Sequence, residues 1–322
     1  MKRAVIPAIC LLLVLSLSCL SFALDRITIR LKWFHSVQFA GIYAAEERGL
    51  FAEAGLEVEL VDGPAADPEL RALADGAFDF VLADSSRHLA LVSQGVANVA
   101  VAAVFQIDPA VLFALSESGI RRPEDLVGKR IMAFPTSYVP HAVLGRVGLS
   151  TDDVELGPRS HDLSELYSGV YDVWSGYFPN EVLQAREDGY DVNVIYPTDY
   201  GVHLYGDVLI ARRNLVEANP GLVQRVVTAL LEGWTWVLDH IDEAAALALA
   251  WDPALDLETQ RSQLRASIPF IYAGEVPFGA MTDRRWASMA AMMIEFGLLP
   301  DGFDVHTAYD QRFTMRPDSV GR

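Results

Sequence analysis

Short strand-like segments alternate with helix-like segments along most of this chain, and this alternation constrains the fold more than any other feature. Residues 27–33 alternate apolar and polar side chains, as a half-buried strand does. The alanine-rich segment 40–48 then stops at Gly49, which is typical of a helix. Strands that alternate with helices favour parallel sheets, so we predict an α/β fold. Further strands are expected at residues 56–61, 78–82, 99–105, 130–134, 172–175, 193–196 and 207–211.

The last third of the chain has a different character. After residue 211 the pattern is helical, with helices expected at 220–240, 242–250, 257–266 and 282–296. A chain of 322 residues is long enough for one large domain or two of ordinary size. We therefore predict two α/β lobes and a helix-rich C-terminal part.

The first residues have the pattern of a secretory signal. Lys2 and Arg3 supply the positive end, and residues 9–17 are apolar but too few to span a membrane. Ser-Phe-Ala at residues 21–23 is a small-x-small cleavage site. We predict cleavage after Ala23 and a periplasmic location.

Both cysteines, Cys10 and Cys19, lie within this leader. The mature chain would therefore contain neither a disulfide nor a reactive thiol. A lipoprotein anchored through Cys19 is the alternative, although the preceding Ser-Leu-Ser departs from the usual Leu-small-small pattern.

Composition and motifs exclude several classes of function. The chain carries 43 acidic and 25 basic side chains, a net charge of −18, whereas nucleic-acid binding needs a basic patch. Its seven histidines show no His-x-x-x-His or other ligand spacing, so no metal site is expected. A Gly-x-Ser-x-Gly motif and a phosphate loop are both absent from the sequence. We expect no enzymatic activity and no cofactor.

A set of segments, in order along the chain, resembles the substrate-binding proteins of the NMT1/THI5-like (thiamine-pyrimidine) family. They are Leu-Lys-Trp-Phe-His at 31–35, Gln-Phe-Ala-Gly-Ile-Tyr-Ala-Ala at 38–45, Glu-Arg-Gly-Leu-Phe at 47–51, Ala-Gly-Leu-Glu-Val at 54–58, Gly-Ala-Phe-Asp-Phe at 76–80, Asp-Leu-Val-Gly-Lys-Arg-Ile at 125–131, Asn-Pro at 219–220 and Ala-Leu-Leu-Glu-Gly-Trp at 229–234. Fungal members synthesise the thiamine pyrimidine with a cysteine-rich motif, which the mature chain lacks.

The resemblance implies a type II periplasmic binding protein, in which two lobes hold a solute in the cleft between them. Lobe 1 would comprise residues 24–105 and 206–322, and lobe 2 residues 106–205. Residues 106–109 and 200–205 would then be the hinge, where a few backbone torsions absorb the closure. The implied partners are a small heterocyclic ligand and the permease and ATPase of an ABC transporter, and the chain would act as a monomer.

The first candidate ligand contacts, Trp33, Phe34 and His35, follow the first expected strand. Ligands in α/β sheets sit beyond the carboxyl ends of strands. The two aromatic rings can stack on a flat heterocycle, and His35 can donate to a ring nitrogen or carbonyl. The alternatives are that Trp33 continues the buried face of the strand and that His35 is a solvated loop residue.

Polar residues at two helix starts form the second group of candidates. Ser85 and Ser86 follow the strand at 78–82, and Ser137 and Tyr138 take the same position in the facing lobe. Hydroxyl and backbone N–H groups at a helix start can bind an anion or a carbonyl oxygen. The alternative at the first of these starts is plain helix capping by Asp84.

The third group follows from the family resemblance. Tyr177 and Glu181 repeat the Tyr-x-x-x-Glu spacing of the thiamine-pyrimidine binders, in which the ring stacks on the base and the carboxylate pairs with its amino group. Alternatively, Glu181 is a first-turn residue favoured by the helix dipole. Gln106 and Tyr205, in the implied hinge segments, complete the set of candidates.

The sequence also departs from the pattern of the thiamine-pyrimidine binders. Lys32 stands where they commonly carry aspartate, and their Pro-Asn-x-x-His signature is absent. Sulfonate, nitrate and riboflavin-type binders share the scaffold. Because the candidate segments contain Glu181 and only one basic residue, we rank an aminopyrimidine first and a flavin-like ring second. A module that reports its ligand to a membrane sensor remains the alternative to a transport protein.

Overall fold

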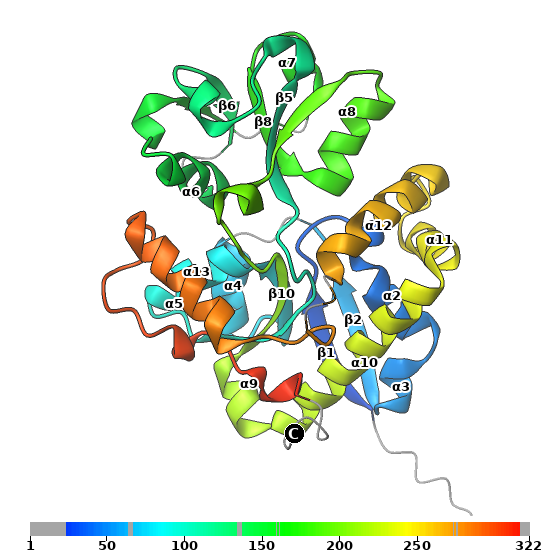
Figure 1. Ribbon diagram of the computed structural model, residues 1–322. Coiled ribbons are helices and arrows are strands. Elements are labelled where there is room, and N and C mark those ends of the chain that lie inside the picture. The colour runs from blue at the N-terminus through cyan, green and yellow to red at the C-terminus, as the bar shows by residue number, and fades with distance from the viewer. Residues whose placement is uncertain are drawn as a thin grey trace, which may run out of the picture.

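The computed structural model describes residues 24–315, except 64–66, 134–136, 159, 161, 273 and 275. The predicted signal sequence, with Cys10 and Cys19, lies outside these residues. The described chain forms two lobes, one above the other in Figure 1, and each is built on a five-stranded sheet. The predicted two-lobe α/β fold is thus confirmed.

The lobe 1 sheet contains the first four strands of the chain and the last one. Its strand order is β2-β1-β3-β10-β4. The bounds are β1 Asp25–Arg30, β2 Leu56–Val61, β3 Phe80–Asp84, β4 Asn98–Ala103 and β10 Asp207–Arg212. β1 ends three residues before the predicted position, so Lys32 and Trp33 lie in a loop that follows the strand.

The lobe 2 sheet has the order β7-β6-β8-β5-β9. Its strands are β5 Ala110–Leu115, β6 Arg130–Met132, β7 Glu155–Gly157, β8 Val173–Tyr177 and β9 Val192–Ile195. β5 runs antiparallel to β8 and β9, and in lobe 1 β10 runs antiparallel to β3 and β4. The prediction of parallel strands is therefore wrong for β10, and β5, which the sequence patterns did not predict, is antiparallel as well. Each of these two strands enters its sheet from the other lobe, whereas a parallel neighbour needs a crossover within one lobe.

Helices cover both sheets (Figure 1). In lobe 1 they are α2 Ala40–Glu47, α3 Leu50–Glu53, α4 Asp67–Ala74, α5 Ser85–Ser93, α9 Arg213–Ala218, α10 Pro220–Asp239, α11 Ile241–Trp251, α12 Leu257–Ile271 and α13 Asp283–Glu295. In lobe 2 they are α6 Tyr138–Arg146, α7 Ser164–Tyr167 and α8 Leu183–Glu187.

Helices α2 and α10 cross at very short range over the lobe 1 core. A Cβ atom on Gly41 would lie 2.2 Å from the ring of Trp234, and one on Gly233 would lie 2.2 Å from the carbonyl oxygen of Gly41. The ring of Trp234 is fully buried in this crossing. Glycine at both positions is therefore what allows the two helices to pack so closely.

Two segments, residues 104–109 and 196–206, connect the lobes, and the second contains a short 3₁₀ helix at Pro197–Tyr200. The backbone N–H of Asp108 donates to Leu204 over 3.1 Å, and that of Gly206 donates to Phe105 over 2.9 Å. These hydrogen bonds hold the two segments together as one connection between the lobes.

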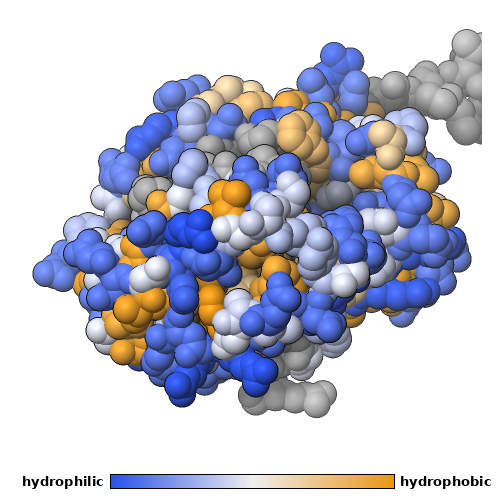
Figure 2. Space-filling view, turned by 90° about the horizontal axis from the view of Figure 1, so that it is seen from above, coloured by the Kyte–Doolittle hydropathy of each residue, from blue (hydrophilic) through white to orange (hydrophobic). Residues whose placement is uncertain are grey.

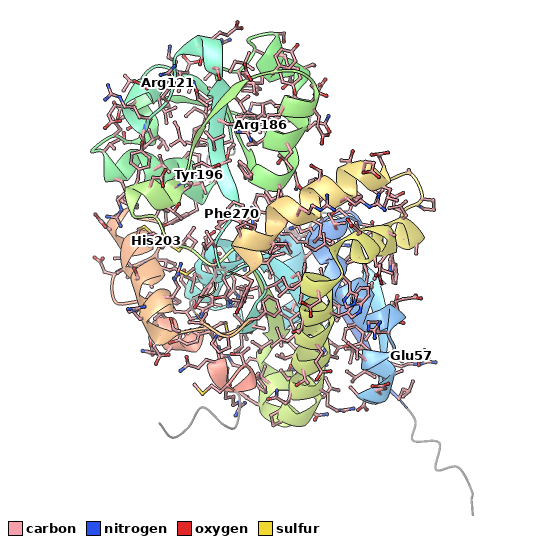
Figure 3. All side chains as sticks on the ribbon, turned by 45° about the vertical axis from the view of Figure 1, so that its right-hand side comes forward. Glu57, Arg121, Arg186, Tyr196, His203 and Phe270 are labelled. Carbon is pink, nitrogen blue, oxygen red and sulfur yellow. The ribbon has the colours of Figure 1, made fainter. Side chains whose placement is uncertain are left out.

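Helix α12 is a further link between the lobes. The ring of Phe270, near its C-terminal end, lies 5.9 Å from that of Phe178 in lobe 2, which in turn lies 5.7 Å from Tyr196. Figure 3 shows Phe270 and Tyr196 at the facing edges of the two lobes. The carbonyl of Phe270 also accepts a hydrogen bond from the N–H of Ile107, in the connecting segment. The end of α12 therefore touches lobe 2 and the hinge together.

The surface is predominantly hydrophilic where Figure 2 views the molecule from the lobe 2 end, and apolar residues lie there in scattered groups. Among the described residues, none of the helices combines the length and hydrophobicity that crossing a membrane requires.

Candidate solute-binding site between the lobes

Four polar side chains meet where the two lobes face each other. The Nζ atom of Lys32 lies 2.5 Å from Oδ1 of Asp84 and 2.8 Å from Oδ1 of Asp207. It also donates to the hydroxyl of Tyr177, which belongs to lobe 2. We call these four residues the Lys32 cluster. An ammonium group has three N–H donors, so these three oxygens use all of them.

The strands explain why these residues meet. Asp84 is the last residue of β3 and Asp207 the first of β10, and the antiparallel register places them directly opposite each other. Lys32 follows the end of β1, which neighbours β3, and Tyr177 ends β8 in the other lobe. All four therefore lie at strand ends that face the opposite lobe, the usual place for ligands in α/β sheets.

The charges in the cluster stabilise one another. Burial alone would lower the pKa of Lys32, but the carboxylates of Asp207 and Asp84 outweigh it and hold the pKa above its ordinary value. Burial would likewise raise the pKa of Asp84, yet the ammonium of Lys32 holds it below its usual range. For Tyr177, burial and then the charge of Asp84 raise the pKa, so the neutral phenol donates to Asp84 over 3.0 Å.

The two carboxylates differ in their access to solvent. The side chain of Asp207 is 1% exposed, and its Oδ2 accepts a hydrogen bond from Gln38 over 2.6 Å. The side chain of Asp84 is 29% exposed, and within the described part of the chain its Oδ2 accepts no hydrogen bond. Of the two carboxylates, that of Asp84 is therefore the one that solvent reaches.

Asp84 stands at the N-cap position of α5, but its side chain makes no capping hydrogen bond. The prediction that capping accounts for this residue is therefore wrong. Instead, the ammonium of Lys32 and the phenol of Tyr177 donate hydrogen bonds to the carboxylate. The ion pair with the largely buried ammonium of Lys32 compensates a full charge, which a capping bond to a backbone N–H would not do.

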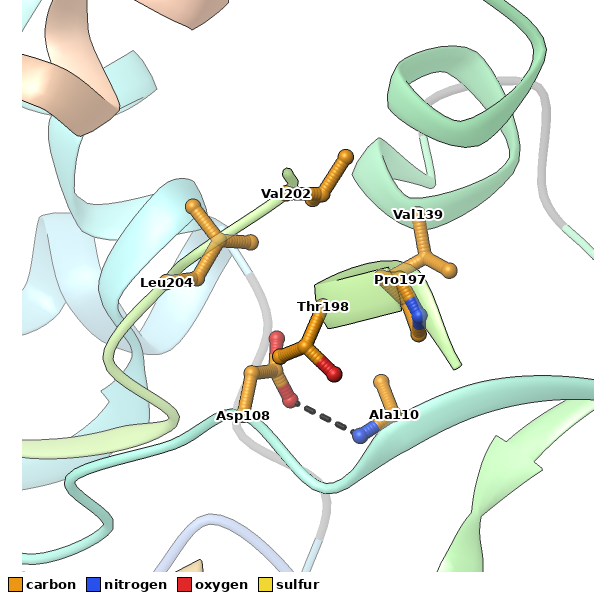
Figure 4. A pocket seen from close by; sticks show the side chains of 7 residues that line it. All are labelled: Asp108, Ala110, Val139, Pro197, Thr198, Val202 and Leu204. Atoms are coloured by element: carbon orange, nitrogen blue, oxygen red, sulfur yellow. Dashed lines mark hydrogen bonds between the residues drawn. The ribbon is translucent and has the colours of Figure 1, made fainter. Parts of the chain in front are cut away.

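A third carboxylate, that of Asp108, lies in the hinge behind the cluster. Its Oδ1 accepts a hydrogen bond from the N–H of Ala110 over 3.0 Å (Figure 4). Burial, and next the charge of Asp84, raise the pKa of Asp108 to about 7. The residue lines a small pocket; the other lining residues are Ala110, Val139, Pro197, Thr198, Val202 and Leu204.

The three predicted contacts after β1 separate in space. Trp33 is half-buried against the lobe 1 core, and its ring meets that of Phe34 edge-on at 5.5 Å. Phe34 is 52% exposed. His35 turns away toward α11, where its ring stacks on Trp251 and its Nδ1 lies 2.9 Å from the hydroxyl of Tyr43. Of the three residues, only Trp33 is next to Lys32 in the sequence.

The predicted residues at the start of α5 and in the hinge have partners within the protein. The buried hydroxyl of Ser85 donates to the carbonyl of Tyr205 over 2.5 Å, whereas Ser86 is half-buried. Gln106 is buried and donates to the carbonyls of Ala103 and Ala280.

The hydroxyl of Tyr205 accepts from the N–H of Thr282 over 3.0 Å. Tyr205 and Gln106 also line a second pocket, beside the N-terminal end of α13.

In lobe 2, Ser137 and Tyr138 begin α6. Ser137 is half-buried and makes no side-chain capping bond. Tyr138 packs among residues of lobe 1, and its buried hydroxyl has no hydrogen-bond partner within the described residues.

The structure brings Tyr177 and Glu181 together at the end of β8. Oε2 of Glu181 accepts a hydrogen bond from the backbone N–H of Tyr177 over 2.7 Å. This carboxylate fits because residue 176 is glycine: a Cβ atom there would lie 2.9 Å from the same oxygen. Glu181 therefore fixes the backbone from which the Tyr177 ring extends.

Sequence reasoning missed the roles of Asp84, Asp207, Gln38 and Asp108, and treated Lys32 only as a departure from a family pattern. For two of these residues, Asp84 and Asp207, the sequence does contain a signal. Asp84 ends an apolar strand and Asp207 begins one, and an aspartate at the edge of a buried strand needs a partner. The identity of that partner depends on the tertiary fold.

Among the described residues, no group of three or more His, Cys, Asp or Glu side chains could hold a metal ion.

Known proteins share this architecture. The riboflavin-binding protein RibY of Chloroflexus aurantiacus is 28% identical over 306 residues, which cover 90% of this chain and 86% of RibY. The formylaminopyrimidine-binding protein of Halalkalibacterium halodurans is 26% identical over 84% of this chain and 85% of its own.

Among solved structures, the periplasmic aliphatic sulphonate-binding protein SsuA of Escherichia coli superposes with a TM-score of 0.71 at 19% identity, covering 89% of this chain and 92% of SsuA. The fold is therefore that of the type II periplasmic binding proteins. The family model described as NMT1/THI5 like matches residues 36–244, and the chain belongs to this family.

Proposed function

We propose that this protein is the extracytoplasmic solute-binding component of an ABC importer and that it holds a planar heterocycle between its lobes. An aminopyrimidine of the thiamine-precursor type ranks first among the candidate ligands, and a flavin second. The observation that carries the proposal is the Lys32 cluster. It lies at the strand ends where the two sheets face each other, and its hydrogen bonds link the two lobes.

The charge of the cluster favours a neutral or cationic solute. One ammonium stands against two carboxylates, and all three of its N–H groups are already used. Lys32 therefore has no donor left for an anion such as a sulfonate. An anionic solute would also meet the exposed oxygen of Asp84 in a site of low dielectric, where like charges repel strongly. The ligand of SsuA is thus not expected to transfer with the fold.

The ring of Tyr177, which belongs to the cluster, suits a flat solute. Tyr177 comes from lobe 2, whereas its partners Lys32, Asp84 and Asp207 belong to lobe 1. Rotation of the lobes about the two connecting segments would move this ring away from lobe 1, admit a heterocycle and close upon it. Stacking of aromatic rings contributes on the order of 1 kcal/mol beyond the burial of surface.

The transport role rests on the family and on the predicted leader. The names of the relatives RibY and the formylaminopyrimidine-binding protein describe binding of small heterocycles. The predicted signal sequence supports export, and the lack of cysteine after residue 23 is compatible with it. A sensor protein that reports the same ligand to a membrane partner is the second candidate, because it would need the same site.

The test is a thermal-shift and calorimetry screen of the mature chain with a 4-aminopyrimidine thiamine precursor, riboflavin and an alkanesulfonate. A ligand that binds only the folded protein raises the unfolding temperature by mass action. We expect a shift with the aminopyrimidine. Tight binding of the sulfonate alone would overturn the proposed ligand class. Uptake of the bound solute by cells that carry the gene, and its loss on deletion, would distinguish transport from sensing.

A further inference from the structure

We propose that Asp84 is the specificity-determining residue of this site and that its carboxylate selects rings bearing an exocyclic amino group. The inference rests on the proposed function, since it assigns the residue that reads the heterocycle. It differs from the expectation drawn from the family resemblance, which gives that role to Glu181.

The carboxylates near the facing edges of the lobes differ in which of their oxygens are available. Asp207 is buried and hydrogen-bonded through both of its oxygens, to Lys32 and to Gln38. Glu181 uses Oε2 to hold the backbone N–H of Tyr177. Asp84 keeps a side chain that is 29% exposed, and its Oδ2 accepts no hydrogen bond from the described residues. Of the two carboxylates in the Lys32 cluster, Asp84 alone has an oxygen that accepts no hydrogen bond from the described residues, and its partner Tyr177 belongs to the other lobe.

Lys32 and Tyr177 position this carboxylate. Both donate to the same oxygen, Oδ1, which restricts rotation of the Asp84 carboxylate and leaves Oδ2 as the acceptor for a ligand. The ammonium also keeps Asp84 ionised, which strengthens any hydrogen bond that it accepts. Lys32 is in this sense a positioning residue, and its own donors are used up.

The charge of Asp84 determines which rings it can bind. An ionised carboxylate only accepts hydrogen bonds, so it discriminates by the presence of an N–H donor on the ring. An amino group donates to it, whereas the carbonyl oxygen of an oxo ring at the same position would face it with lone pairs. A site built for a hydrogen bond rejects an analogue that leaves its buried group unpaired, by a factor that reaches about 10⁴ in favourable cases.

The experiment compares the affinity of one ring in two forms, a 4-aminopyrimidine and its 4-oxo counterpart, by calorimetry. In the wild type we expect the amino form to bind at least about tenfold more tightly. Asp84→Asn keeps the shape but replaces the exposed acceptor with an amide that can also donate, so the ratio of the two affinities should fall to near one. Asp207→Asn is the matched control, because it perturbs the same Lys32 cluster from a buried position. Its effect should be similar for both rings and leave the ratio unchanged.

Two further measurements keep the proposal open to refutation if Asp84→Asn folds poorly. The wild type should lose affinity for a 4-dimethylamino ring, which has no N–H to donate, to about the level of the oxo ring. Glu181→Gln should retain the amino-to-oxo ratio.

A wild type that binds the dimethylamino ring as well as the amino ring would overturn the proposal. So would a ratio that survives in folded Asp84→Asn or collapses only in Glu181→Gln. In each of these cases the protein still binds a heterocycle, and the proposed function stands. Failure of every ring to bind the wild type would instead overturn the function together with the inference.

Discussion

Asp84 and Asp207 lie directly opposite each other on antiparallel strands, and one lysine joins their two carboxylates. Like charges in opposing positions of a sheet destabilise it. The ammonium of Lys32 offsets this repulsion, and the three side chains form a single charged unit at the end of the lobe 1 sheet.

The first prediction follows from this unit. Lys32→Met leaves two neighbouring carboxylates without their cation, and removal of one partner from a buried ion pair costs about 3–5 kcal/mol. We expect a loss of that size in the free energy of unfolding, measured by urea denaturation. Lys32→Met combined with Asp84→Asn should recover part of it.

The control is Arg26, whose ion pair with Glu57 joins side chains that are 81% and 52% exposed. Arg26→Met should change stability little, because solvent screens such pairs. An equally small effect of Lys32→Met would show that the cluster contributes nothing to stability.

The second prediction concerns pH and Asp108. Burial and the neighbouring charge of Asp84 raise its pKa from 3.8 to about 7, against the opposing effect of Lys32. The folded protein therefore keeps this proton at pH values where the unfolded chain has released it. The stabilising contribution is complete below about pH 4 and is lost as the pH rises through about 7.

Asp108→Asn is neutral at every pH and keeps an oxygen acceptor for the N–H of Ala110. The melting temperature of the variant minus that of the wild type should therefore increase between about pH 5 and pH 8. If the difference in melting temperature stayed constant over this range, Asp108 would have its ordinary pKa in the folded protein.

The third prediction tests the crossing of α2 and α10. In Gly233→Ala the new methyl group would lie 2.2 Å from the carbonyl oxygen of Gly41, so the helices must move apart. We expect a loss of about 1–3 kcal/mol in the free energy of unfolding, as for other overpacked cores.

Gly221, in the same helix, is the matched control, because the nearest atom to an added Cβ there is 3.8 Å away. Gly221→Ala should stabilise the protein by about 0.4–1 kcal/mol through the unfolded state. If both variants were stabilised, the close approach of the two helices would be wrong.

The fourth prediction separates the ring of Tyr177 from its hydroxyl. Tyr177→Ala removes a stacking surface and should weaken binding of a heterocycle by about 1–3 kcal/mol, as measured by tryptophan quenching or calorimetry. Tyr177→Phe keeps the ring and loses only the hydroxyl contacts to Lys32, Asp84 and Asp207, so it should bind more tightly than the alanine variant. Equal affinities for all three proteins would assign Tyr177 to packing.

The fifth prediction concerns export. Mass spectrometry of the protein purified from its native envelope should find an N-terminus at Leu24, because residues 21–23 form the cleavage site. A lipid-modified N-terminal Cys19 would establish the lipoprotein alternative, and an intact Met1 would contradict both.

Local patterns in the sequence predicted individual elements well. The strand expected at 56–61 coincides with β2, and the helix expected at 220–240 is α10 within one residue. β5 was not predicted, because Ala110–Leu115 is a short apolar run that periodicity cannot assign to strand or helix.

Strand direction and the candidate site depend on contacts that are distant along the chain. Asp84, Tyr177 and Asp207 lie 52, 145 and 175 residues from Lys32. A spacing pattern cannot reveal a cluster of this kind, and the departure at Lys32 could be explained only by partners that the fold supplies.

The position of β10 has a consequence for the order in which the protein acquires its structure. This strand lies between β3 and β4, yet it is synthesised more than 100 residues after both of them. The lobe 1 sheet therefore cannot be completed while only its N-terminal strands exist. The strand that joins β3 to β4 is missing until the chain has been synthesised past residue 212. Pairings that close such long loops form slowly. Under the proposed export, lobe 1 would be completed only after residue 212 has crossed the membrane.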